Sequence, residues 1–533
     1  MKIPKKKELL ELQKKYRTDK KIAEVYGVPS RLVAYWRSKK NIGQYSFSKY
    51  SHEKIIELWE RYGDDRLAGA ELGISGPGFR QWRIKYGIKK KPVQLKMEQL
   101  ELDLRGTYRK SRDSRRETFI KKLLAKKSGL KSVEEGQVIS VRPDLAVSVD
   151  DTEQIIKQFK LTGFPKVWDN SKITIILNDW TQNEFGKIAD VHKRIRKFVK
   201  KQRIEKFYDI GWGIPYQITL EEGLILPSRL IVATDNQATS HGSIGAFSTC
   251  ISPLDMAVVW ASGRIWLKVP KTIKVVINGL PTRGVFAKDI ILKLSRDLHF
   301  EDINYKALEF YGDAVSTMTV PQRLILTSSS LEIGAKSAII PFDDVSQRYL
   351  KKITKERFSP IAPDINAKYE NEIEIDVSYL TPQVACLNKK HCVKPVEDVA
   401  GKKIDQIVLC GCSSGRLDDL EMVVSILRGR RIHRDTRMII VPASRKTYLA
   451  AIDKGYIRSL VGSGCVMLSP GCGSCAGAHK DMLAADERIL TTNSCDLIRQ
   501  TNSKNPEIYL SSPATAAATA LEGAIADPRK YLL

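Results

Sequence analysis

Residues 468–477 read LSPGCGSCAG and place Cys472 and Cys475 three positions apart. Two thiols at this spacing can bind one metal centre, form a redox-active disulfide, or pack as small core residues. A third cysteine, Cys412, stands about 60 residues earlier in LCGCSSGR (409–416), where an apolar run ends. What these three thiols hold decides how the rest of the chain is interpreted.

The number of thiols separates the possible metal centres. Three thiolates suit a [4Fe–4S] cluster with one open iron, which can bind a substrate hydroxyl as a Lewis acid. Four thiolates would complete a zinc site or an ordinary cluster site. Cys410 and Cys465 are close enough in sequence to supply a fourth ligand. Spacing alone therefore leaves the zinc, redox and structural alternatives open.

Length and composition indicate a large globular protein. A chain of 533 residues is long enough for several domains. We find no run of about 18 apolar residues that would predict a transmembrane helix, and the first residues, MKIPKKKELL, lack the apolar segment of a secretory signal. We therefore predict a cytoplasmic protein with no membrane partner. In a reducing compartment, clustered cysteines indicate metal binding or redox chemistry.

Positive charge is concentrated at the N-terminus. Residues 1–116 contain 30 Lys and Arg against 14 Asp and Glu, which is +16 of the net +27. A basic block of this kind predicts a polyanion partner, with a solvated basic face as the alternative.

The same block contains an internal repeat, because residues 11–42 recur 46 positions later. A small residue followed by glycine four positions on allows two helices to approach closely and the first to end in a left-handed turn. This pattern predicts a tandem helix-turn-helix. The matches are Glu11-Leu12 with Glu57-Leu58, Tyr16 with Tyr62, Ala23 with Gly69, Gly27-Val28 with Gly73-Ile74, Val33 with Phe79, Trp36-Arg37 with Trp82-Arg83, and Ile42 with Ile88.

A helix-turn-helix places its second helix in the major groove of duplex DNA, and residues 31–40 and 79–86 are the candidate helices. The alternative is a helical protein-interaction module of the same shape. We expect a short helix from Val93 to Leu104 and a basic tether from Arg105 to Arg116. The residues expected to reach phosphates or base edges are Arg31, Tyr35, Arg37, Lys39, Arg80, Gln81, Arg83 and Lys85.

From about residue 119, apolar runs alternate with helical patterns, which predicts an α/β fold with mixed or parallel sheets. Polar loops follow several of these runs, where α/β proteins place ligand sites. The predicted strands are ITIILN (173–178), LIVAT (230–234), IKVVING (273–279), QIVLC (406–410) and MIIVPA (438–443).

A collinear series of motifs runs through this body: TSHGSIGAF (239–247), DMAVVWASGRIWLKVP (255–270), GVFAKDIILKL (284–294), YKALEFYGDAV (305–315), LEIGAKSAIIPFD (331–343), CSSGRLDDL (412–420), LSPGCGSCAG (468–477) and SSPATAAATALEGAIADPRKYL (511–532). The series resembles the aconitase superfamily, and within it the large subunits of 3-isopropylmalate dehydratase and homoaconitase. The resemblance implies an aconitase-like three-domain α/β body, which here follows an all-α helix-turn-helix region.

The domain boundaries follow from the resemblance and the repeat. We place the two helix-turn-helix repeats at 1–43 and 44–90, and a basic linker at 91–118. The first two aconitase-like domains are expected in 119–400. The third, which carries the cluster cysteines, is expected in 401–533.

The resemblance implies that Cys412, Cys472 and Cys475 hold a [4Fe–4S] cluster. It also implies dehydration and rehydration of a hydroxy di- or tricarboxylate. In the family, the serine base lies on a swivelling domain or a separate small subunit. Because this chain ends where the large subunits of the family end, the resemblance implies a small-subunit partner.

Some family positions persist here. Asp235, Glu332, Asn493 and Arg499 match the family's site. The resemblance implies that Glu332 lies beside the open iron and that Arg499, with Asn493, binds a substrate carboxylate. Asp179 stands in the family's Asp-His position, so Asp235, Glu332 and Asp179 are the expected catalytic residues.

Other catalytic positions depart from the family's pattern. Three histidines are absent, and neither Asp, Tyr nor Gln carries a proton near neutral pH as imidazole does. A carboxylate-binding arginine is absent as well. The replacements are Asn178-Asp179 for Asp-His, Ile214-Pro215-Tyr216-Gln217 for Ile-Cys-His-Gln or Ile-Ile-His-Gln, Asp235-Asn236-Gln237 for Asp-Ser-His, Ser328-Ser329 for Asn-Met and Asn493-Ser494 for Asn-Arg.

Three functional hypotheses follow. The first is an iron–sulfur hydro-lyase with altered substrate or altered acid–base groups. The second is a catalytically inactive DNA-binding regulator that senses a cluster or a metabolite. The third is a paralogue whose body is purely structural. The repeats and the lost histidines favour the regulator, whereas the retained cysteines, Glu332 and Arg499 favour a ligand site in either of the first two cases.

Overall fold

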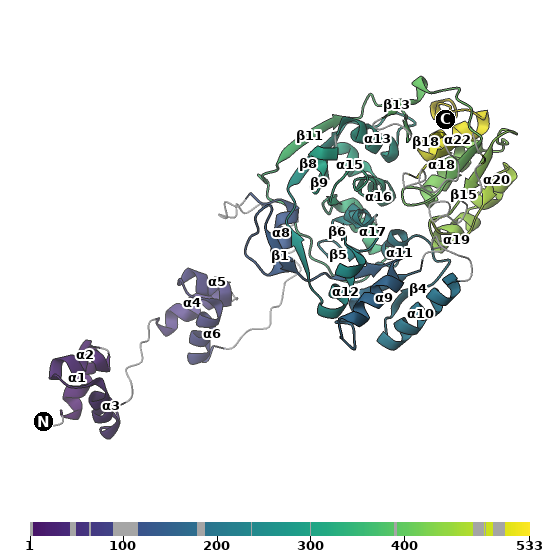
Figure 1. Ribbon diagram of the computed structural model, residues 1–533. Coiled ribbons are helices and arrows are strands. Elements are labelled where there is room, and N and C mark those ends of the chain that lie inside the picture. The colour runs from purple at the N-terminus through teal and green to yellow at the C-terminus, as the bar shows by residue number, and fades with distance from the viewer. Residues whose placement is uncertain are drawn as a thin grey trace. The chain divides into compact units, whose positions relative to one another are not determined.

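The computed structural model consists of two compact units, residues 1–112 and 113–533, coloured purple and blue to yellow in Figure 1. The predicted helix at 93–104 lies outside the described residues, as does the predicted tether except for Arg116. No helix in the described part is long and apolar enough to cross a membrane. The residues described are 4–16, 18–42, 50–62, 65–88, 116–177, 187–235, 237–298, 300–387, 392–472, 484, 487–493 and 507–532.

The first repeat contains three helices, α1 (Lys6–Tyr16), α2 (Asp19–Tyr26) and α3 (Ser30–Lys39). The Thr18 hydroxyl accepts a hydrogen bond from the Lys21 amide and so caps the start of α2. Gly27 ends α2 in the left-handed conformation, with φ of 60°. The helices close around a small apolar core of Leu9, Ile22, Ala23, Val33, Trp36 and Ile42.

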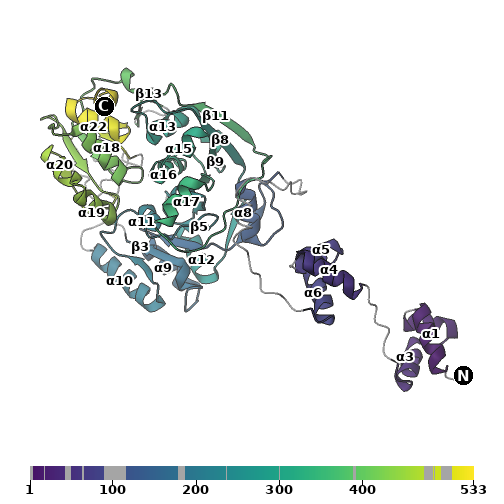
Figure 2. The same ribbon diagram turned by 180° about the vertical axis from the view of Figure 1, so that it is seen from behind.

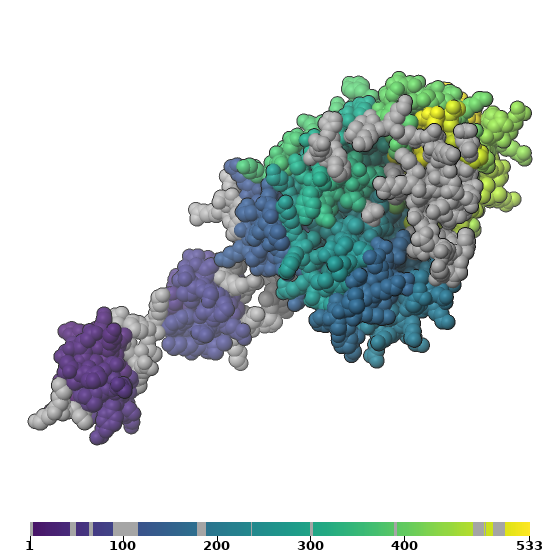
Figure 3. All heavy atoms as spheres, in the orientation of Figure 1, coloured from purple at the N-terminus to yellow at the C-terminus, as the bar shows by residue number. Residues whose placement is uncertain are grey.

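The second repeat has the same build, with α4 (His52–Tyr62), α5 (Asp65–Glu71) and α6 (Gly76–Lys85). A Cβ atom at Gly69 would lie 2.8 Å from the Ile74 carbonyl oxygen, so a small residue is required there. The helices of each repeat pack into a small rounded body (Figure 3). Its core is made by Ile55, Leu58, Trp59, Ala68 and Phe79.

An identical ion pair links the second and third helices of each repeat. Arg37 Nε lies 2.7 Å from Asp19 Oδ1, and Arg83 Nε lies 2.7 Å from Asp65 Oδ1. Each guanidinium also donates to the carbonyl five residues later. Arg37 and Arg83 are only 8% and 5% exposed. The expectation that these two arginines reach DNA is therefore corrected, because their guanidinium groups are used inside the repeats.

The first sheet of the body is parallel, with strand order β4-β3-β2-β5-β6. Helix α11 (Pro215–Glu221) follows β4, and the 3-10 helix η2 (Ala238–Ile244) follows β5. Further helices of this part are α8 (Phe119–Ser128), α9 (Thr152–Leu161), α10 (Lys187–Gln202) and α12 (Pro253–Ser262). The strands are β2 (Leu145–Ser148), β3 (Ile173–Ile176), β4 (Lys206–Tyr208), β5 (Leu230–Ala233) and β6 (Phe247–Cys250).

The second sheet is also parallel, in the order β10-β9-β8-β11. Its strands are β8 (Thr272–Asn278), β9 (Ala307–Tyr311), β10 (Ser337–Ile339) and β11 (Asn371–Asp376). Helices α13 (Ala287–Asp297) and α16 (Val320–Ser329) pack with it. A separate antiparallel ribbon pairs β1 (Val138–Val141) with β7 (Ile265–Lys268).

The third sheet has the order β13-β12-β18-β17-β14-β15-β16, and the five strands from β18 to β16 are parallel. Because it begins at Gln383, it includes chain that precedes the predicted boundary at residue 401. Figure 2 shows it from behind, beside helices α18 (Leu417–Leu427) and α22 (Pro513–Glu522). The strands are β12 (Gln383–Cys386), β13 (Val393–Pro395), β14 (Gln406–Leu409), β15 (Arg437–Ile440), β16 (Val466–Met467), β17 (Arg488–Thr491) and β18 (Glu507–Leu510).

The α/β class with parallel sheets is confirmed. All five apolar runs predicted as strands form strands, and these are β3, β5, β8, β14 and β15. Each sheet contributes strand residues to a large buried cluster, because the strands are apolar on the faces that helices cover.

We expect the ion pair of each repeat to stabilise that repeat alone. Arg83→Met leaves Asp65 without its partner, which costs about 1.5–3 kcal/mol. Hydrogen exchange across α4–α6 in the full chain should accelerate by roughly 10- to 100-fold, while exchange in α1–α3 stays unchanged. Arg80→Met, on the exposed face of the same helix, is the matched control. Equal exchange in the two variants would show that the buried pair contributes nothing.

Candidate functional site

Three predicted site residues follow parallel strands of the third sheet. Cys412 follows β14, Asn493 follows β17, and Cys472 follows β16. Parallel strands bring their carboxyl ends to one edge, where α/β proteins place ligands. The sheet topology therefore gathers two thiols and an amide from three separate parts of the sequence.

Cys412 and Cys472 belong to one buried cluster of side chains, with exposures of 6% and 8%. Cys475 lies outside the described residues. Within the described residues, no group of three or more His, Cys, Asp or Glu side chains is arranged to hold a metal. Two of the three proposed cluster ligands are thus placed in one core.

The cysteines considered as a fourth ligand lie in other cores. Cys410 packs with Val408, Val441, Ile489 and Ile508. Cys465 belongs to the core under α18 and α22, where burial raises the pKa of its thiol to about 12. This separation favours the three-thiol set over a set completed by Cys410 or Cys465.

The loop that carries Cys412 depends on a glycine. Gly411 has φ of +79°, and a Cβ atom there would lie 2.5 Å from the side-chain nitrogen of Asn493. Only glycine allows this close approach in the left-handed conformation. The amide of Asn493, which is fully buried, is therefore held directly against the cysteine loop.

Arg416 ties the same loop to the first sheet's helix α11. Its Nε donates to Gln217 Oε1 at 3.0 Å, and its Nη2 donates to the Cys412 carbonyl at 2.5 Å. The side chain is 2% exposed. Nη1 of Arg416 and the hydroxyl of Ser414 are buried and have no hydrogen-bond partner among the described residues. Orphaned buried donors beside a thiol suit a loop that holds an anionic group such as a cluster.

Gln217 continues the connection to a buried carboxylate. Its amide nitrogen donates to Glu221 at 2.7 Å, and the same Glu221 oxygen accepts from the Ser444 hydroxyl at 2.8 Å. Burial raises the pKa of Glu221 above its usual value. Sequence reasoning did not assign Arg416, Gln217 or Glu221 to the site. The available signal was that Arg416 belongs to the CSSGR motif and that Gln217 is the retained residue of the Ile-Pro-Tyr-Gln segment.

Lys288, on helix α13 beside the second sheet, contacts the same loop. Its ammonium group lies 2.8 Å from the Ser413 hydroxyl, which in turn donates to the Thr492 carbonyl at 2.9 Å. Lys288 is 1% exposed. Residues 412–416 are therefore the place where elements of all three sheets meet, and two buried cations lie there.

Two predicted catalytic carboxylates, those of Asp235 and Glu332, are both hydrogen-bonded to Gln237. The Gln237 backbone N–H donates to Asp235 Oδ1 at 2.7 Å, and its side-chain nitrogen donates to Glu332 Oε1 at 3.2 Å. The structure thus brings Asp235 and Glu332 together on a residue that replaces a family histidine. Asp179 and Arg499 lie outside the described residues.

The other substituted positions are buried. Tyr216 is 2% exposed and packs in the core that contains Cys412 and Cys472. Ser328 is fully buried, and Ser329 is 4% exposed. The Ser329 hydroxyl has no hydrogen-bond partner in the part of the chain that the structure describes. All three of these positions, at which the sequence departs from the family's motifs, are therefore buried.

A histidine next to this region is held neutral. His241 of η2 lies between the Thr219 hydroxyl, at 2.9 Å from Nε2, and the Ser248 hydroxyl, at 3.0 Å from Nδ1. Burial lowers the pKa of His241 to about 3. It therefore does not replace the missing histidines as a proton carrier near neutral pH. It links η2 to α11 instead.

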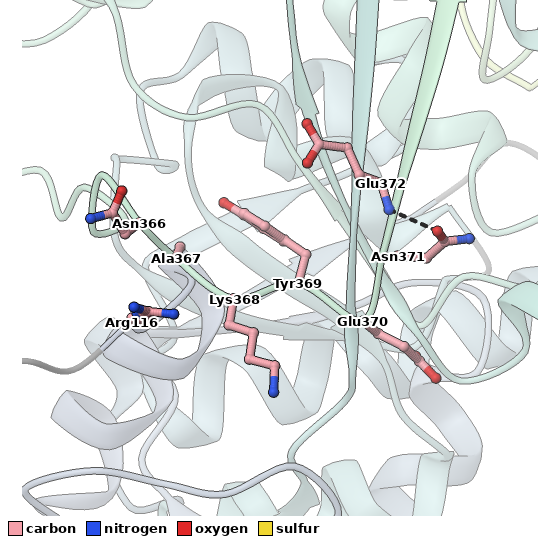
Figure 4. Close-up of a pocket in the computed structure, with 8 residues that line it drawn as sticks. All are labelled: Arg116, Asn366, Ala367, Lys368, Tyr369, Glu370, Asn371 and Glu372. Carbon is pink, nitrogen blue, oxygen red and sulfur yellow. Dashed lines mark hydrogen bonds between the residues drawn. The ribbon is translucent and has the colours of Figure 1, made fainter.

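A pocket of about 400 Å³ lies elsewhere on the body and is lined by Arg116 and residues 366–372 (Figure 4). The Lys368 amide donates to the Arg116 carbonyl, and the Tyr369 hydroxyl donates to the buried Glu309. None of the predicted site residues lines this pocket.

Comparison with known proteins gives a consistent result. The aconitase family, described as aconitate hydratase, matches residues 165–523. The 3-isopropylmalate dehydratase large subunit 1 of Methanopyrus kandleri is 38% identical over 416 residues, which cover 78% of this chain and 99% of that protein. The probable methanogen homoaconitase large subunit of Methanosarcina mazei is 38% identical over 388 residues, covering 73% and 98%.

A solved structure, aconitase X of Thermococcus kodakaraensis in its holo-form, covers 66% of this chain and 83% of its own. Its sequence identity is 12% and its TM-score is 0.41, which is too distant to bear on the site. The relatives from Methanopyrus and Methanosarcina match about three quarters of this chain, so the remainder is additional to them.

We expect Cys412→Ser, Cys472→Ser and Cys475→Ser each to abolish a cluster, because two thiolates hold one poorly. The measurement is iron and acid-labile sulfide content, with the visible absorption spectrum, after anaerobic purification. Cys465→Ser is the matched control, since Cys465 lies in another core, and it should retain the cluster. Stoichiometric zinc without sulfide would contradict the assignment.

We expect the buried, neutral His241 to make the free energy of unfolding decrease at acidic pH. Its folded-state pKa of about 3 lies below the unfolded value of about 6.5. Its contribution is therefore fully present above pH 6.5 and is lost as pH falls toward 3. At pH 5 the loss is about 2 kcal/mol relative to pH 7. His241→Gln should flatten this slope in urea unfolding. A slope unchanged in His241→Gln would refute the assignment.

Proposed function

Because this chain belongs to the aconitase family, we propose that its body is the cluster-holding subunit of a hydro-lyase for a hydroxy di- or tricarboxylate. Cys412, Cys472 and Cys475 would hold a [4Fe–4S] cluster. When bound, that group supplies a Lewis-acidic iron for a substrate hydroxyl. The gathering of Cys412 and Cys472 in one buried core is the observation that carries this proposal.

The chain's own residues position the ligands of this site. Arg416 holds the loop of Cys412 against α11, while Lys288 holds it against α13. Both cations also favour an anionic group at the loop. Asn493 and Arg499 are proposed to bind a substrate carboxylate, with Arg499 as the bidentate partner.

We further propose that turnover is weak. Gln237 holds Asp235 and Glu332 in place, but a side-chain amide does not act as a general acid or base at neutral pH. Asp179 stands at a second histidine position, and an unperturbed aspartate is ionised at pH 7. The site therefore retains groups that bind and orient while it lacks the expected proton carriers.

The same proposal implies a partner and a compartment. The relatives named above are large subunits, so we propose a small subunit that carries the swivelling domain and the serine base. A cytoplasmic location fits, because a reducing compartment keeps cysteine ligands as thiols.

A second candidate function is a DNA-binding regulator whose body senses a cluster or a metabolite. The observation that favours it is charge on the last helix of each repeat. Helices α3 and α6 contain arginine and lysine but no acidic residue. Positive helices suit the phosphates of duplex DNA, and a body with weak turnover suits sensing.

We expect turnover of 3-isopropylmalate or homocitrate-type substrates to be weak or undetectable, even with a family small subunit and an intact cluster. General acid–base help is worth about 10²–10⁴-fold, and this is the deficit expected. The combined variant Asp179→His, Tyr216→His, Gln237→His and Ser494→Arg should raise the rate in an anaerobic assay.

The matched control is the same combined variant with Gln237→Glu in place of Gln237→His. It changes charge at the same position without supplying imidazole, so it should not restore the rate. Family-like turnover by the unmodified chain would show that the histidines are dispensable and would support the hydro-lyase over the regulator.

A further inference from the structure

One face of the last helix in each repeat is basic and exposed. On α3 it comprises Arg31, Leu32, Tyr35, Ser38 and Lys39, spaced so that they share a side of the helix. On α6 the exposed residues that share a side of the helix are Pro77, Arg80, Gln81, Ile84 and Lys85. With Arg37 and Arg83 neutralised inside the repeats, these faces contain the cations of α3 and α6 that remain available to a partner.

Large apolar side chains lie among these cations. Leu32 is 37% exposed, Tyr35 is 54% exposed and Ile84 is 61% exposed. None of the three belongs to the apolar core of its repeat. A helix face that presents both cations and exposed apolar side chains suits a partner that carries both anionic and apolar groups.

The major groove of duplex DNA has this combination. Phosphates line its edges, and the C5-methyl group of thymine is the apolar feature on its floor. A protein partner would also suit the apolar residues, but the absence of acidic residues on α3 and α6 favours a polyanion.

We propose, on the basis of the DNA binding proposed above, that α3 and α6 read thymine methyl groups through Leu32 and Ile84. Arg31, Lys39 and Lys85 contact phosphates and set the position of each helix. Gln81 has the side chain that pairs with the N6 and N7 edge of adenine. The preferred sites of both repeats therefore contain A·T pairs.

The test uses the full-length protein and two duplexes of equal length. One is alternating dA·dT, and the other has deoxyuridine in place of every thymidine, which removes only the methyl groups. Binding is measured by fluorescence anisotropy between about 50 and 200 mM salt, where phosphate contacts dominate the salt slope. We expect the deoxyuridine duplex to bind about 4-fold more weakly for each thymine methyl group that the protein buries.

Two double variants distinguish recognition of the thymine methyl groups from electrostatic binding of the phosphates. The double variant Leu32→Ala, Ile84→Ala should bind both duplexes equally, with its salt slope unchanged. The double variant Arg31→Ala, Lys85→Ala should weaken binding to both duplexes by the same factor and reduce the slope. Val25→Ala, at an apolar side chain of α2 that is 52% exposed, is the matched control and should keep the preference for thymidine.

Two negative outcomes are distinguishable. Equal binding of the two duplexes by the unmodified chain would overturn methyl reading and leave the proposed DNA function intact. Binding to neither duplex at about 50 mM salt would overturn the DNA function itself, and the exposed faces would then be assigned to a protein partner.

Discussion

The buried guanidinium of Arg416 is the contact on which the candidate centre depends. It joins the loop of Cys412 to Gln217, which is 199 positions away in the sequence. A buried charge is costly unless it is hydrogen-bonded, and the Nε and Nη2 atoms of Arg416 have partners. The hydrogen bonds of Arg416 therefore fix the Cys412 carbonyl, and with it the loop that carries the thiol, relative to helix α11. Lys288, on helix α13 beside the second sheet, donates a hydrogen bond to Ser413 of the same loop. Elements that pack on all three sheets therefore meet at residues 412–416.

Binding and proton transfer are separable properties of this centre. Two of the thiols share a core, and the carboxylates of Asp235 and Glu332 are held in a defined arrangement. The residue that holds them, Gln237, stands where the family resemblance expects a histidine, and its amide hydrogen-bonds without titrating near neutral pH. Under the function proposed above, this substitution keeps the hydrogen bonds to both carboxylates and lowers the rate of proton transfer. A site that keeps its binding groups and lacks the expected proton carrier suits the proposed sensor better than the proposed enzyme.

Local patterns in the sequence predicted local structure well. The apolar runs became strands because β-branched residues between helical segments suit buried parallel sheets, and the glycines at 27 and 73 adopt the left-handed conformation. The pairing of Arg416 with Gln217 could not be read in advance, because it depends on the docking of distant elements. The expectation for Arg37 and Arg83 was wrong for a related reason. Their charge predicted exposed side chains, whereas each is buried in an ion pair with an aspartate 18 positions earlier. Asp179, Cys475 and Arg499 remain predictions.

The duplicated ion pair has an evolutionary consequence. Each repeat contains its own apolar interior and its own Asp–Arg link, and both links close at the same point of the 46-residue period. A segment whose ion pair and apolar core both lie within the segment itself can be duplicated without changes in the neighbouring segments. The solvent-facing positions of one copy, such as Gln81, are then free to diverge from those of the other, such as Tyr35. Gene duplication would thus give two copies with the same interior, whose surfaces can change independently.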